Sequence, residues 1–170
     1  MGYHSVINNI PKDVAVLGIG NLLLGDEGFG VHVIKRLSND YIFKPDIELL
    51  DGGTSGISLM GLIEDVKKLI VIDCIDIKGE YGSIFIFNQK EIKNAQGIRF
   101  SPHQIGLLDV LDLLAIKDMG PSDIRFIGVI GKDFSQGLEL SRPLKNVLPK
   151  VCDLVLTLLK EFNIEAILKR

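Results

Sequence analysis

The fold of this chain is decided by the stretch Gly18-Ile19-Gly20-Asn21-Leu22-Leu23-Leu24-Gly25-Asp26-Glu27-Gly28-Phe29-Gly30. It directly follows the apolar run 14–17, which predicts a short buried strand that ends there. Its glycines let the backbone turn sharply and approach other groups closely. Asp26 and Glu27 stand just before an amphipathic segment, 31–37, which predicts a helix. Two carboxylates are therefore held at a strand-to-helix junction, and we expect Glu27 to form one corner of a metal site.

Segments with strand and helix patterns alternate along the rest of the chain. The predicted strands and helices are, in order, 47–50, 59–66, 69–72, 105–115, 124–130 and 144–159. Residues 81–87 follow a turn and predict an antiparallel edge strand, and Pro149 predicts a kink or restart in the last helix. The alternation predicts a single α/β domain over residues 1–170: three α/β/α layers around a central twisted, mostly parallel sheet with one antiparallel edge strand.

Composition excludes several classes of protein. The 170 residues carry a formal net charge of -3, without the basic surplus expected of a nucleic-acid-binding protein. The two cysteines show no CxxC spacing and predict reduced core residues. Residues 1–13 lack the apolar core of a signal peptide, and no apolar run approaches the length of a membrane helix. We expect a cytoplasmic protein with no membrane partner, and a monomer, since no heptad seam is present.

Polar residues that could carry chemistry stand where the predicted strands end. They are Asp26, Glu27, Asp51, Asp73 and, in a loop before a helix, His103. Parallel strands bring their carboxyl ends to one edge of a sheet, where ligands collect. Two carboxylates and an imidazole suit a divalent ion such as nickel or zinc, with open positions for water or a substrate group. Spacing alone leaves simpler roles open, such as a helix-dipole charge for Glu27 or a cap for Asp73 and His103.

Three other kinds of site compete with the metal hypothesis. Gly18-Ile19-Gly20 after a strand resembles the opening of a dinucleotide-binding loop, but Leu23 stands where the third glycine belongs and the carboxylates would repel a pyrophosphate. A nucleotide-binding module remains the alternative. Cys74 adjoins Asp73, yet no base-and-orienter arrangement for a nucleophilic cysteine can be read from the sequence. No Gly-x-Ser-x-Gly motif is present, which disfavours a serine hydrolase.

Taken together, the motifs of this chain resemble those of the hydrogenase maturation endopeptidases, almost from end to end. The motifs are GIGNLLLGDEGFG (18–30), LLDGGTSG (49–56), LIVIDCI (69–75), SPHQIGLLDVL (101–111) and FIGVIG (126–131). The resemblance implies proteolytic removal of the C-terminal peptide from the nickel-loaded precursor of a nickel–iron hydrogenase large subunit. It assigns Glu27, Asp73 and His103 as the ligands that engage the nickel of that precursor.

The resemblance also implies where the substrate lies, but it leaves the mechanism open. Asp51, Gly52, Gly53 and Thr54 are expected to line the substrate cleft. The metal could polarise the scissile carbonyl and a bound water, or it could only position the substrate while Asp51 or Asp26 activates water. Ni²⁺ is expected to arrive with the substrate, and Zn²⁺ or Cd²⁺ to occupy the same site in vitro. A non-proteolytic assembly chaperone remains a second alternative.

Overall fold

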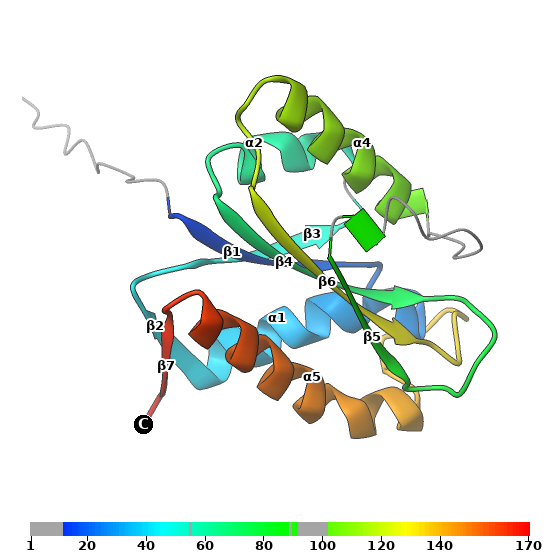
Figure 1. Cartoon of the computed structure of the whole chain (residues 1–170). Helices are drawn as coiled ribbons and strands as arrows, with labels where there is room; N and C mark the ends of the chain where they lie inside the picture. The colour runs from blue at the N-terminus through cyan, green and yellow to red at the C-terminus, as the bar shows by residue number, and fades with distance from the viewer. Residues whose placement is uncertain (1–11, 55, 89, 92–101) are drawn as a thin grey trace, which may run out of the picture.

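The structure is a computed structural model that describes residues 12–54, 56–88, 90–91 and 102–170, without the side chains of residues 102–105. Helices lie on both faces of one central sheet (Figure 1). The strands are β1 (Val14–Ile19), β2 (Tyr41–Lys44), β3 (Glu48–Gly53), β4 (Lys68–Ile75), β5 (Ile84–Asn88), β6 (Asp123–Ile130) and β7 (Glu165–Leu168). The helices are α1 (Phe29–Asp40), α2 (Met60–Ile63), α4 (Pro102–Ile116) and α5 (Arg142–Glu161), with short 3₁₀ turns η1 (Gly25–Gly28) and η2 (Ile57–Leu59).

The central sheet has the predicted, mostly parallel arrangement. Its strand order is β3-β1-β4-β6-β5. The first four strands are parallel, whereas β5 pairs antiparallel with β6 at the edge. The predicted antiparallel edge strand is therefore confirmed. Since β1, β3, β4 and β6 run in one direction, the loops after them lie at the same end of the sheet, where the carboxyl ends of these strands meet. We call this end the carboxyl-terminal edge.

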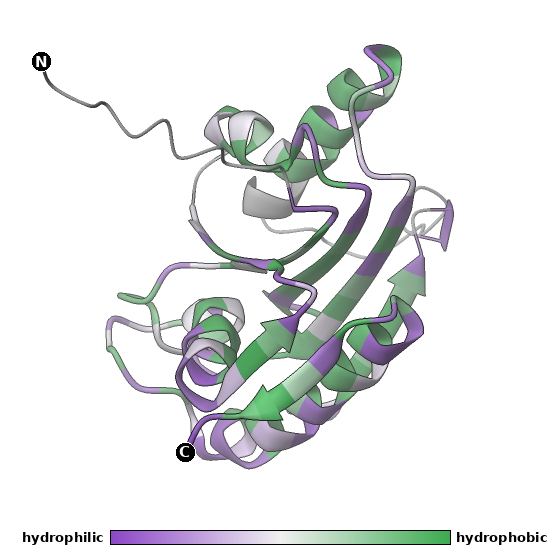
Figure 2. Ribbon diagram, turned by 90° about the vertical axis from the view of Figure 1, so that its left-hand side faces the viewer, coloured by the Kyte–Doolittle hydropathy of each residue, from purple (hydrophilic) through white to green (hydrophobic). Residues whose placement is uncertain are grey.

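Each face of the sheet packs against its own pair of helices. Alternate residues of a strand point to opposite faces, so Val16 and Ile70 join the core formed with α1 and α5, while Leu17 and Val71 join the core formed with α2 and α4. In Figure 2 much of the central sheet is green, the colour of hydrophobic residues. Strands that are buried on both faces explain the nearly continuous apolar runs in the sequence.

Three local features differ from the sequence prediction. Residues 41–44 and 165–168 form a second, two-stranded antiparallel sheet, which the sequence analysis did not predict. The predicted helix at 59–66 is shorter, because η2 supplies its first turn and α2 ends at Ile63. The last helix does not restart at Pro149, since α5 continues through it from Arg142 to Glu161.

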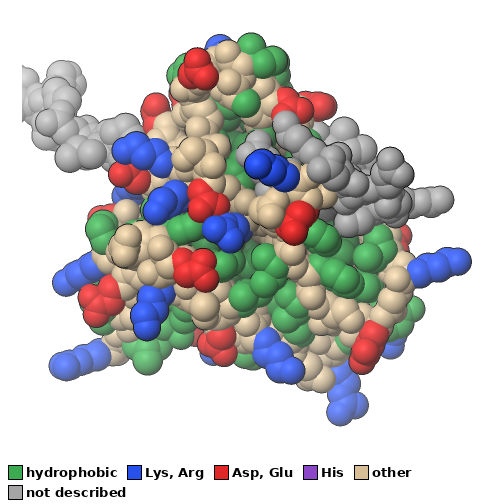
Figure 3. All heavy atoms as spheres, in the orientation of Figure 1, with side chains coloured by type: hydrophobic (Ala, Val, Ile, Leu, Met, Phe, Trp, Pro, Cys, Tyr) green, Lys and Arg blue, Asp and Glu red, His purple; other side chains and the backbone are tan. Residues whose placement is uncertain are grey.

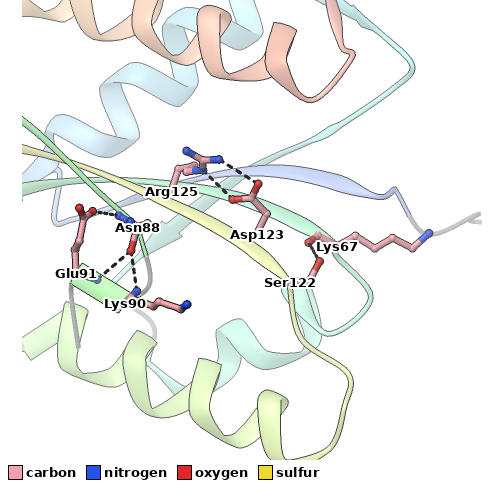
Figure 4. A network of polar contacts seen from close by, with 7 residues as sticks. All are labelled: Lys67, Asn88, Lys90, Glu91, Ser122, Asp123 and Arg125. Atoms are coloured by element: carbon pink, nitrogen blue, oxygen red, sulfur yellow. Dashed lines mark hydrogen bonds and ion pairs between the residues drawn. The ribbon is translucent and has the colours of Figure 1, made fainter. Parts of the chain in front are cut away.

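A cluster of polar contacts lies at the opposite edge of the sheet from the loops described above (Figure 4). Arg125 donates to the carboxylate of Asp123 at the start of β6, over 2.8 Å from Nε. Asn88, at the end of β5, accepts hydrogen bonds from the backbone of Lys90 and Glu91. These contacts fix the ends of strands and turns.

Within the described residues, no helix is both long and apolar enough to span a bilayer.

Candidate active site

The glycine-rich stretch folds back against the end of β3. The backbone N–H of Gly20 donates to the carbonyl oxygen of Gly53 over 2.9 Å. Gly20 has a φ of 133°, and a Cβ added there would lie 1.7 Å from the carbonyl oxygen of Glu27, so only glycine fits. These contacts bring the turn that carries Glu27 next to the loop that follows Asp51.

Glu27 and Asp73 come to the same edge from different elements. Glu27 lies in η1 and is half-buried, with its Oε2 atom shielded from solvent. Asp73 lies near the end of β4 and is 3% exposed, and its Oδ1 accepts a hydrogen bond of 2.7 Å from the backbone N–H of Cys74. Two predicted ligands are therefore placed at the carboxyl-terminal edge of the sheet.

The electrostatics of this edge suit a cation. Burial raises the pKa of the Cys74 thiol, and the negative charges of Asp73, Asp26, Glu27 and Asp76 raise it further. Carboxylates of η1, of β4 and of the segment after β4 thus act on one buried thiol. A concentration of negative charge that opposes thiolate formation also favours a bound metal ion.

Asp26 is a buried carboxylate that joins two loops. It is completely inaccessible to solvent. Its Oδ2 accepts hydrogen bonds from the backbone N–H groups of Lys132 (2.8 Å) and Asp133 (2.9 Å) and from the hydroxyl of Ser141 (2.7 Å), and its Oδ1 accepts one from the Ser141 N–H (2.7 Å). These contacts favour a structural role for Asp26 over the predicted role in activating water.

Asp51, the other predicted catalytic carboxylate, is exposed. It lies in β3, and its Oδ1 accepts a hydrogen bond of 3.0 Å from the backbone N–H of Gly53. Gly52 is buried, whereas Gly53 and Thr54 are partly or fully accessible. Of the two carboxylates proposed to activate water, only Asp51 reaches solvent. The role of residues 52–54 in a substrate cleft stays a prediction.

The position of His103 is given by the backbone of α4. His103 is the second residue of that helix, and its side chain lies outside the described part of the structure. One helical turn later, a Cβ added to Gly106 would lie 3.2 Å from the Cα of Gly56, so the start of α4 packs against the loop after β3. Among the described side chains, no three His, Cys, Asp or Glu residues form a metal-binding group. The set of Glu27, Asp73 and His103 stays a prediction.

The sequence predicts a loop at 131–137, but not that residues 131–141 hold the glycine-rich stretch in place. Besides the bonds to Asp26, the Asp26 N–H donates to the carbonyl of Asp133 (2.8 Å) and the Gly25 N–H donates to the carbonyl of Gly137 (2.8 Å). The imidazole of His32 in α1 also bonds the backbone of Leu138. The partners are more than 100 residues apart along the chain, so no local pattern predicts them.

The two cysteines do not favour nucleophilic catalysis. Both are free thiols and both are buried, as the sequence predicts for reduced core residues. Burial raises the pKa of Cys152 to about 11. Because the thiolate is the nucleophile, a raised pKa leaves both groups protonated near neutral pH.

Comparison with known proteins identifies the family. The chain matches the family model described as hydrogenase maturation protease over residues 31–158. It is 34% identical over 155 residues to the hydrogenase 2 maturation protease of Escherichia coli (strain K12), which covers 91% of this chain and 94% of that protein.

Solved structures give the same family. The hydrogenase maturating endopeptidase HybD from E. coli superposes with a TM-score of 0.85 at 33% identity, covering 92% of this chain and 97% of that one. The [NiFe] hydrogenase maturation protease HybD from Thermococcus kodakarensis gives 0.71 at 28% identity, covering 85% and 97%. These matches confirm the predicted fold, and they favour a hydrolase over the nucleotide-binding module. The chain belongs to the hydrogenase maturation protease family.

Proposed function

We propose that this protein removes the C-terminal peptide from the nickel-loaded precursor of a nickel–iron hydrogenase large subunit. The observation that carries the proposal is the placement of Glu27 and Asp73 at the loop-bearing edge of the sheet in a chain that belongs to this protease family. The precursor is then a transient partner of a monomeric, cytoplasmic protease. Two free, buried cysteines suit a reducing compartment.

The nickel of the precursor is the recognition element in this proposal. Glu27, Asp73 and His103 would supply two carboxylates and an imidazole, which are suitable donors for a divalent transition metal. Three protein donors leave positions for thiolates of the precursor or for water. Zn²⁺ or Cd²⁺ would occupy the same donors in vitro. A precursor that lacks nickel would then bind poorly and escape cleavage.

Asp51 is the residue that we propose to activate the attacking water. Its carboxylate is accessible, and it lies in β3, whose last residue, Gly53, accepts a hydrogen bond from Gly20 in the glycine-rich stretch that carries Glu27. An ionised carboxylate can accept the proton of a water that attacks the scissile carbonyl. Asp26 cannot do so without giving up hydrogen bonds that join two loops.

The test is the rate at which variants process a nickel-loaded precursor. Glu27→Gln, Asp73→Asn and His103→Ala remove one proposed nickel ligand each, and we expect processing to fall by at least about 100-fold. Asp51→Asn removes the proposed base, and we expect a loss of about 100- to 10,000-fold with little change in precursor binding. The matched control is Asp109→Asn, which neutralises an exposed carboxylate of α4.

The outcomes separate the proposed roles. Folded ligand variants that process the precursor at the wild-type rate would remove the metal site. A wild-type rate in Asp51→Asn alone would remove the assignment of the base and leave metal recognition standing. A precursor that binds but keeps its full mass with wild-type protein would favour the assembly chaperone.

A further inference from the structure

Two neighbouring pockets form one groove on the surface beside the candidate active site. The larger, of about 830 Å³, is lined by residues of the β4–β5 and β6–α5 connections. The smaller, of about 450 Å³, is lined mainly by the first turns of α5. Tyr81 and Lys132 line both pockets, so the two adjoin. We call this feature the basic groove.

The wall of the groove contacts elements that also carry the candidate active site. Gly131 forms part of its wall, and a Cβ added there would lie 2.5 Å from the Sγ of Cys74 and 3.3 Å from the Cβ of Asp26. Asp76, at the same end, is three residues beyond Asp73. The groove therefore adjoins the end of β4, which carries Asp73, and the turn that carries Glu27.

The charge of the groove is opposite to that of the whole protein. Its lining contains four exposed basic residues, Lys78, Lys132, Arg142 and Lys150, against one acidic residue, Asp76. The formal net charge of the chain is -3, so this surplus is local. In Figure 3, basic side chains project from several parts of this face, including its right-hand edge. The first turn of α5 also lines the groove, and the N-terminal end of this helix carries a partial positive charge.

The groove also offers apolar surface between these charges. Tyr81 is 53% exposed at the junction of the two pockets, and Phe134 and Pro143 line one pocket each. Basic side chains around an accessible aromatic ring suit an extended peptide that carries carboxylates.

We infer that the basic groove binds the C-terminal tail of the precursor, as an acidic peptide that ends in a free carboxylate. The inference rests on the proposed function, because that reaction requires the tail to lie beyond the scissile bond. The lysines attract the tail's carboxylates and draw it away from the metal-binding edge. Binding energy from this non-reacting part of the substrate then helps to place the scissile bond.

The test is a double-mutant cycle on the kinetics of processing. The variant Lys78→Gln/Lys132→Gln/Lys150→Gln removes three groove charges while the backbone bond from Lys132 to Asp26 is kept. The matched control, Lys35→Gln/Lys117→Gln/Lys160→Gln, removes three exposed charges elsewhere, with the same change in net charge. Each is assayed with the nickel-loaded precursor and with a precursor whose acidic tail residues are replaced by amides.

We expect the groove variant to raise KM about tenfold at low salt with kcat nearly unchanged, and the control to match wild type. The difference in KM between the groove variant and wild type should shrink with the neutral tail and at high salt. An unchanged KM in the groove variant would overturn the inference while the protease function stands. A raised KM that persists with the neutral tail would assign the groove to another acidic surface and also overturn it. Absence of cleavage by wild-type protein would instead defeat the proposed function itself.

Discussion

At the scale of single residues, neighbouring carboxylates of the glycine-rich stretch have different environments. Asp26 is fully buried and its two oxygens accept four hydrogen bonds from the 131–141 loop. Glu27 is only half-buried, and its charge acts on the thiol of Cys74, the residue after Asp73. The sequence analysis offers Glu27 as a metal ligand and Asp26 as a residue that activates water. It does not predict the structural role of Asp26, because the donors to Asp26 come from residues that are distant along the chain.

Replacing Asp26 by Asn should destabilise the fold. The amide keeps one acceptor oxygen and places an NH₂ group against backbone N–H donors, so buried donors lose their partner. We expect the free energy of unfolding in urea to fall by about 3 kcal/mol. Asp133→Asn is the control, because the exposed carboxylate of Asp133 accepts hydrogen bonds from Ser135 in its own turn, and the substitution keeps the backbone bonds to Asp26. Its effect should stay below about 1 kcal/mol. Equal effects of the two substitutions would contradict the structural role of Asp26.

The environment of His32 predicts that the free energy of unfolding depends on pH. Burial, and then the charge of Lys35, lower its pKa below 6.5, partly opposed by the bond to the Leu138 backbone. Its Nε2 is buried and has no hydrogen-bond partner among the described residues. A lowered pKa means that the folded state favours the neutral imidazole. The contribution of His32 to the free energy of unfolding is therefore fully present above the pKa that His32 has in the unfolded chain, and it is lost as pH falls below that value.

The measurement is the free energy of unfolding of wild type and His32→Gln between pH 7.5 and pH 5. We expect the wild type to lose stability as pH falls through about 6.5, and the variant to show a shallower slope over the same interval. Parallel curves would show that His32 does not carry this dependence.

At the scale of elements, α1 approaches the sheet closely through glycines. A Cβ added to Gly18 would lie 2.2 Å from the carbonyl oxygen of Gly30, and one added to Gly30 would lie 2.3 Å from that of Ile72. Both distances are far below contact distance, so the helix backbone packs directly on β1 and β4. This close packing sets the position of η1, and with it that of Glu27.

Gly30→Ala should therefore separate α1 from the sheet. We expect it to lower the free energy of unfolding by about 3 kcal/mol and to reduce processing, because η1 moves with the helix. Gly61→Ala is the matched control: a Cβ there meets no atom within 4 Å. Alanine at this helical position should leave stability unchanged or raise it by up to about 1 kcal/mol. A Gly30→Ala protein as stable as wild type would contradict the close approach.

The elements differ in how well the sequence predicts them. The buried strands and the long helix α5 are predicted because each carries its own apolar pattern over many residues. The sheet of β2 and β7 is not, because each strand has four residues and its partner lies at the other end of the chain. For the same reason, the sequence does not predict the contacts between residues 131–141 and the glycine-rich stretch.

At the scale of the whole molecule, parallel topology explains why the proposed chemistry gathers at one edge. The ends of β1, β3, β4 and β6 meet there, and the start of α4 packs against the loop after β3. The sequence therefore predicts which strand ends share a site, given the fold class. It does not predict the basic groove, since its lysines come from separate connections and a helix whose proximity depends on tertiary packing.

The most direct test of the proposed function is the intact mass of a hydrogenase large-subunit precursor before and after incubation with this protein. We expect a single loss of the C-terminal peptide from the nickel-loaded precursor, and none from the nickel-free precursor. An unchanged mass, with nickel loading verified and the protein folded, would contradict the proposed cleavage. Equal cleavage of both precursors would contradict the proposed recognition of nickel.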